Sequence, residues 1–192
     1  MQLSQLTQDV YNHLYRDIHQ FRSTFDLPVG APTSLDLQAD TLHTSLIIEE
    51  MTELAEADSR VEQADAIVDS VYVLMGRLVH LGQQHVGDNI AISYLIDLLL
   101  NVAKNRQIDF ISCWDEVHSS NMSKVCRNQQ ELDETIAAYA KQGVEIVGSV
   151  KGDFLIAKCA QDVEMAGKTV RKGKVLKSVY YRPADLSKLV QA

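Results

Sequence analysis

Two stretches decide how this chain folds: residues 47–54, Ile-Ile-Glu-Glu-Met-Thr-Glu-Leu, and residues 61–72, Val-Glu-Gln-Ala-Asp-Ala-Ile-Val-Asp-Ser-Val-Tyr. In both, apolar residues recur at helical spacing and acidic residues lie among them. The acidic residues of each stretch are three or four positions apart, so each set shares one helical face. They are Glu49, Glu50 and Glu53 in the first stretch and Glu62, Asp65 and Asp69 in the second.

The residues between the two stretches predict that the two acidic faces meet. Asp58-Ser59-Arg60 favours a helix stop and restart, with a polar residue available as an N-cap. An antiparallel helical hairpin centred on Ser59 brings Glu53 level with Asp65, and it brings the Glu49–Glu50 pair level with Asp69. Four or five carboxylates would then point into one gap between two helices.

Such a group of carboxylates needs a cation. Two like charges about 4 Å apart repel by roughly 4 kcal/mol at an effective dielectric constant near 20. Because the candidate ligands are all oxygens, with no matched His or Cys, they indicate a hard ion, Mg²⁺ or Mn²⁺. The alternative is that these are solvated faces of ordinary amphipathic helices, which are common. The metal site is favoured because the acids lie among apolar residues and Asp69 shortly precedes the apolar run 71–75.

The spacing of these acids resembles a known family signature. Glu49-Glu50-x-x-Glu53 followed by Glu62-x-x-Asp65 resembles the EExxE…ExxD signature of the all-α, MazG-like nucleoside triphosphate pyrophosphohydrolases. Residues 62–76 are similar to the second half of the motif in phosphoribosyl-ATP pyrophosphohydrolase-like members, although the interval between the halves is shorter here than is usual. The resemblance implies a MazG-like antiparallel helical bundle. It also implies Mg²⁺-dependent cleavage of a nucleoside triphosphate between its α- and β-phosphates, and a homodimer or a dimer of dimers.

The expected roles of the acids follow from this interpretation. Glu49 is the candidate catalytic residue, which would orient or deprotonate the attacking water. Bound metal alone lowers the pKa of a water by several units, so a strong side-chain base is not required. The candidate metal ligands are Glu50, Glu53, Asp65 and Asp69, with Glu62 as a further candidate.

A second informative stretch is residues 118–124, His-Ser-Ser-Asn-Met-Ser-Lys. Asn121 and Lys124 are three apart on one helical face, where an amide and an ammonium suit phosphate oxygens or a base edge. Taken alone, a solvated helix face is the commoner explanation. The string resembles the H-x-S-N-M-S/T-K string of phosphoribosyl-ATP pyrophosphohydrolase-like proteins, which implies that Asn121 and Lys124 contact the nucleotide. Lys177, in the basic tail, is a candidate phosphate contact, although a plain surface strand explains that tail equally well.

Residue patterning along the chain predicts a mainly α fold with a small C-terminal β-hairpin. The helical bundle is expected over residues 1–143, and the hairpin and tail over residues 144–192 of the same domain. Helices are predicted at 3–25, 37–58, 61–81, 88–104, 108–126 and 131–142, and strands at 144–150 and 154–159 around a Lys151-Gly152-Asp153 turn.

Composition narrows the partners and the compartment. A net charge of −8 argues against nucleic-acid binding, which relies on Lys and Arg at phosphates. The most apolar stretch, 90–103, is interrupted and too short for a bilayer, and the three widely spaced cysteines indicate a reducing compartment. We therefore expect a cytoplasmic nucleotide pyrophosphohydrolase with neither a nucleic-acid nor a membrane partner. Two alternatives remain: a phosphoribosyl-ATP pyrophosphohydrolase of histidine synthesis, and a non-catalytic helical binding module stabilised by metal.

Overall fold

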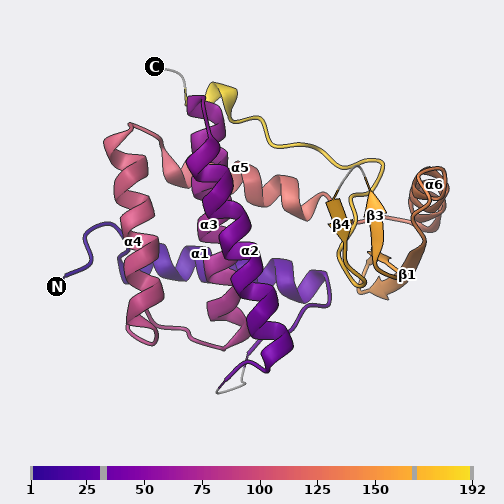
Figure 1. The fold of residues 1–192 in the computed structure, drawn as a ribbon, viewed down its shortest axis with the longest axis horizontal. Coiled ribbons are helices and arrows are strands. Elements are labelled where there is room, and N and C mark those ends of the chain that lie inside the picture. Colours follow the sequence, from indigo (N-terminus) through magenta and orange to yellow (C-terminus); the bar gives the residue numbers. More distant parts are fainter. Residues whose placement is uncertain (1, 31–33, 166–167, 191–192) are drawn as a thin grey trace. The chain divides into compact units, whose positions relative to one another are not determined.

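The computed structural model describes residues 2–30, 34–165 and 168–190 (Figure 1), and within them the chain forms six α-helices and two small antiparallel sheets. The helices are α1 (Gln8–Thr24), α2 (Leu37–Glu56), α3 (Arg60–His80), α4 (Ile90–Asn105), α5 (Phe110–Met122) and α6 (Gln129–Ala140). The predicted mainly α fold with a C-terminal β-hairpin is confirmed. Residues 27–32, Leu-Pro-Val-Gly-Ala-Pro, whose two prolines and glycine predict a loop, lie partly outside the described residues.

The chain divides into two compact units. The first comprises residues 1–23, 27–118 and 185–192, and the second comprises residues 24–26 and 119–184. Helix α6 therefore belongs with the strands, in the second unit. The expectation that one domain divides at residue 143 into bundle and tail stays a prediction. No helix in the described part of the chain combines the length and apolar character needed to cross a membrane.

Helix α3 is the central element of the first unit. Nearly all of its faces are buried, including Ile67, Leu74 and Met75 at 0% exposure. Helix α2 lies beside it (Figure 1) and buries only His43. Twelve buried residues on α3 against one on α2 show that α2 is an outer layer attached to α3.

The turn between α2 and α3 is held by hydrogen bonds at the start of α3. The Ser59 hydroxyl accepts from the Glu62 N–H, and the Glu62 carboxylate accepts from the Ser59 and Asp58 N–H groups. This reciprocal pattern is a capping box, which satisfies backbone donors that the helix itself cannot. The predicted restart at Ser59 is confirmed. At the other end α3 stops at His80, one residue before the predicted end, and Gly82 follows with a φ of +69°, the left-handed conformation that glycine adopts readily.

Helix α1 begins at Gln8, five residues later than predicted. The backbone N–H groups of Ser4, Gln5 and Leu6 donate to the carboxylate of Asp97, with distances of 2.7 to 3.2 Å. Burial opposes ionisation of Asp97, but these hydrogen bonds outweigh it and hold the pKa of the carboxyl below its usual range. The segment before Gln8 is therefore ordered by a side chain of α4, which helical periodicity cannot reveal.

The second unit contains the predicted hairpin. Strands β1 (Ile146–Lys151) and β2 (Phe154–Cys159) pair antiparallel around Gly152, whose φ is +57°. Helix α6 packs on this hairpin so closely that a Cβ at Gly148 would lie 2.7 Å from Cδ2 of Leu132.

Three features of the chain after α5 differ from expectation. Helix α5 ends at Met122 instead of 126, because Cys126 exchanges backbone hydrogen bonds with Leu155 of β2. A second hairpin, β3 (Val163–Met165) and β4 (Lys168–Val170), was not predicted, since three-residue strands are too short to show alternation. The chain ends in a short 3₁₀ helix, η1 (Leu186–Lys188), which packs against α3 in the first unit.

Candidate metal centre on helices α2 and α3

Five acidic side chains from α2 and α3 are grouped by charge, because four of them raise the pKa of the fifth, Glu50. They form what we call the acidic cluster: Glu49, Glu50, Glu53, Asp65 and Asp69. Glu50 is half-buried, and its pKa is raised to about 8, first by burial and then by the negative charges of Asp69, Glu53, Glu49 and Asp65. Like charges gathered around a partly desolvated carboxyl favour its neutral form. A bound cation would reverse this preference.

A pocket of about 260 Å³ lies where α2 turns into α3. Glu53 lines it from α2 and Asp65 lines it from α3. The other lining residues are Glu56, Ala57, Asp58, Glu62 and Ala66. Acidic side chains therefore face one hollow from both helices, and all the charged groups that line it are carboxylates, which suits a hard divalent cation.

Glu62 has a structural role that accounts for its position. One of its carboxylate oxygens caps α3, and hydrogen bonds from Ser59 and Asp58 hold the pKa of the exposed carboxyl below its usual range. The predicted role of Glu62 as a metal ligand stays a prediction.

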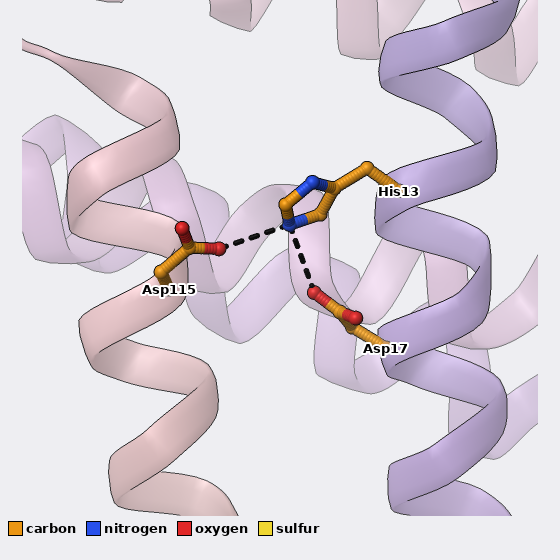
Figure 2. Close-up of side chains that lie close together, drawn as sticks. All are labelled: His13, Asp17 and Asp115. Carbon is orange, nitrogen blue, oxygen red and sulfur yellow. Dashed lines mark hydrogen bonds and ion pairs between the residues drawn. The ribbon is translucent and has the colours of Figure 1, made fainter.

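The acids of the cluster affect the pKa of Glu50, but their carboxylate oxygens are not as close to one another as the ligands of one metal ion. Among the described residues, one group of His, Cys, Asp or Glu side chains has three ligand atoms within 4.8 Å of one another, and it lies elsewhere in the first unit: His13, Asp17 and Asp115 (Figure 2). Side-chain rotations within the acidic cluster would be needed for its carboxylates to share one ion. Because the carboxylates repel, a spread arrangement is the one expected of them without a cation.

One pattern in the sequence points to part of this second group. His13 and Asp17 are four positions apart on α1 and therefore share a face. Their partner Asp115 lies in α5, about a hundred positions later. Helical spacing therefore cannot predict that it contacts His13.

The predicted substrate-binding residues gather in the second unit. The Lys124 ammonium donates to the Asn121 side-chain oxygen at 2.6 Å, and the backbone oxygen of Lys124 accepts from the Ser178 N–H at 3.2 Å. The Lys177 ammonium lies 4.5 Å from the centre of the Tyr181 ring, a cation–π arrangement. Lys124 and Lys177 therefore lie near each other, because the residue after Lys177 is hydrogen-bonded to the backbone of Lys124. Their contact with a nucleotide stays a prediction.

Comparison with models of protein families gives one match, to phosphoribosyl-ATP pyrophosphohydrolase over residues 18–85. Comparisons with curated proteins and with solved structures gave no significant match. The matched segment contains the whole of α2 and α3, and with them every member of the acidic cluster. Over this segment the chain is similar to the phosphoribosyl-ATP pyrophosphohydrolase family, whose domain is one of the MazG-like all-α nucleoside triphosphate pyrophosphohydrolase superfamily.

Proposed function

We propose that this protein hydrolyses a nucleoside triphosphate between its α- and β-phosphates, with Mg²⁺ or Mn²⁺, to give the monophosphate and pyrophosphate. The observation that carries the proposal is the pKa of Glu50, raised to about 8 by burial and by four neighbouring carboxylates. Strongly shifted carboxyl groups in one place are typical of functional sites. The family match supports pyrophosphohydrolase activity on a nucleotide, and enzymes of this family typically use a divalent metal.

Each acid of the cluster has a proposed role. Glu50, Glu53, Asp65 and Asp69 would hold the ion, since the charges of the other three act on Glu50 from both α2 and α3. Bound Mg²⁺ neutralises charge on phosphate oxygens and makes a coordinated water more acidic. Glu49 is exposed on the same helix, close enough to raise the pKa of Glu50. It would orient the attacking water and accept its proton.

The phosphates and base would be met by residues at the end of α5 and in the tail. We assign these contacts to Asn121, Lys124 and Lys177, which the second unit holds in one neighbourhood. Lysine ammonium groups form strong charge-assisted hydrogen bonds to phosphate.

The second candidate substrate is phosphoribosyl-ATP, because the matching family model bears that name. This substrate has the same anhydride bond, and it carries an additional phosphoribosyl group on its base. The third hypothesis, a non-catalytic module stabilised by metal, shares the acidic cluster but predicts no turnover.

One experiment separates the three hypotheses. The purified chain is incubated with Mg²⁺ and either phosphoribosyl-ATP or a panel of ordinary and modified nucleoside triphosphates, and pyrophosphate and single phosphate are measured separately. We expect pyrophosphate and a nucleoside monophosphate from at least one triphosphate. Turnover of phosphoribosyl-ATP alone would assign the biosynthetic reaction. A thermal shift with Mg²⁺ but no product from any substrate would leave only the binding module.

We also propose that the protein assembles as a homodimer or a dimer of dimers. Helix α2 exposes Leu37, Leu42 and Ile48, and α4 exposes Leu95 and Leu98, each at 45% or more of its surface. Apolar side chains repeated along two helices are typical of an association surface. We expect size-exclusion chromatography with light scattering to give at least twice the 21.5 kDa of one chain. A single 21.5 kDa species at micromolar concentration would contradict the proposal.

A further inference from the structure

We propose that His13, Asp17 and Asp115 form a second metal site, selective for a transition-metal dication such as Zn²⁺, which joins α1 to α5. Figure 2 shows both carboxylates directed at the same nitrogen of His13. Nε2 of His13 lies 3.1 Å from Oδ2 of Asp17 and 2.9 Å from Oδ1 of Asp115.

The geometry around this nitrogen suits an ion better than a proton. An imidazole nitrogen directs one N–H or one lone pair along a single in-plane direction, so one N–H cannot point straight at two oxygens. An octahedral ion bound at about 2.1 Å holds neighbouring ligand atoms about 3 Å apart. The two observed separations are close to that edge length, and all three ligand atoms lie within 4.8 Å of one another.

Asp17 is supported in the manner of a metal ligand. Its side chain is only 8% exposed, and its Oδ2 accepts a hydrogen bond from Nε1 of Trp114 at 3.0 Å. Its other oxygen, Oδ1, is bound by the guanidinium of Arg16 at 3.0 to 3.1 Å. Outer partners of this kind fix the orientation of the ligating atom. Oδ2 of a nearly buried carboxylate is thereby held toward His13.

The outer side of the site is open, and its ligand types select the ion. Asp115 is 56% exposed and His13 29% exposed, so water can complete the coordination shell. One imidazole with two carboxylates favours Zn²⁺, Mn²⁺, Co²⁺ or Ni²⁺, whereas Mg²⁺ prefers oxygen alone. The acidic cluster consists only of oxygen ligands, so the two sites are expected to differ in preferred metal.

Trp114 provides a local reporter, because it is the single tryptophan of the chain and bonds directly to Asp17. The experiment uses the full chain carrying Glu50→Gln and Asp69→Asn, so that metal at the acidic cluster does not contribute. Titration with Co²⁺ is expected to quench the tryptophan fluorescence and saturate at one equivalent. Zn²⁺ should then reverse the quenching by displacing Co²⁺.

Three variants on that background test one proposed ligand, one control position and one hydrogen-bond partner of a ligand. Asp115→Asn is expected to weaken Co²⁺ binding by more than the roughly 10–100-fold that follows the loss of an outer partner. Asp9→Asn, an exposed acid in the first turn of α1, should leave the titration unchanged. Trp114→Phe removes the reporter along with the N–H donor, so it is followed by calorimetry, where a 10–100-fold loss of Zn²⁺ affinity is expected.

The outcomes separate this inference from the proposed function, since the titrated protein has two acids of the acidic cluster neutralised and none of the readouts is turnover. Saturable quenching that Asp115→Asn removes would support the site. Absence of quenching, or equal quenching in the Asp115→Asn variant, would overturn it. The three side chains would then be a histidine–carboxylate ion pair that connects two helices.

Discussion

Glu50→Gln and Asp69→Asn are each expected to lower Mg²⁺-dependent release of pyrophosphate by about 10³-fold or more in kcat/KM. Both residues belong to the acidic cluster, and Asp69 is the charged group with the largest effect on the pKa of Glu50. A catalytic metal contributes several kcal/mol of transition-state stabilisation, and each 1.36 kcal/mol is worth about tenfold in rate. Removal of one charged ligand therefore has a large effect, although each substitution preserves side-chain shape.

The measurement is initial rate against substrate concentration at saturating Mg²⁺. Asp9→Asn is the matched control, because it removes one exposed carboxylate from the same unit and should keep full activity. Far-UV circular dichroism should show unchanged helicity in all three proteins. Near-normal rates in both the Glu50→Gln and the Asp69→Asn proteins would exclude the acidic cluster as the catalytic metal site.

The same Glu50→Gln substitution is expected to stabilise the metal-free protein at alkaline pH. The pKa of Glu50 is raised from 4.5 to about 8 on folding, so the folded state holds a proton that the unfolded state has released. The stabilising contribution of this carboxyl is complete below pH 4.5 and is lost as the pH rises through 8. For a half-buried group, with allowance for solvent screening, the loss amounts to about 3 kcal/mol.

This prediction is measured by urea unfolding in EDTA at pH 5 and pH 8.5. The wild-type free energy of unfolding should fall by about 3 kcal/mol relative to the Glu50→Gln protein between these two values. His43 contributes in the opposite direction, since burial lowers its pKa to about 4, but it does so equally in both proteins. Addition of Mg²⁺ at pH 8.5 should restore stability to the wild type more than to the variant. Parallel pH profiles for the two proteins would show that the carboxylates do not interact in solution.

The parts of the fold that were predicted correctly depend on local chemistry. Ser59 caps α3, Gly82 ends it, and Gly152 turns the hairpin, and each signal lies within a few residues of the structure that it determines. The parts that were wrong depend on partners far away in the chain. The late start of α1 is due to Asp97, and the early end of α5 is due to the pairing of Cys126 with Leu155.

The candidate site divides in the same way. Helical spacing was enough to place Glu50, Glu53, Asp65 and Asp69 on facing sides of two consecutive helices, because a short turn leaves little choice of geometry. The cap formed by Glu62 could have been recognised from Ser59 three positions earlier, since that pair is a capping-box pattern. The meeting of His13 with Asp115 required the packing of α1 against α5, which no local pattern encodes.

The position of η1 has a consequence for how the protein is made. Leu186 and Val190, which are 3% and 4% exposed, belong to the first unit, and η1 packs against α3. Residues that follow the whole 119–184 segment in the sequence therefore complete the hydrophobic core of a unit whose other parts are synthesised before that segment. Part of α3 therefore stays uncovered on the nascent chain until residues 119–184, which form most of the second unit, have been synthesised.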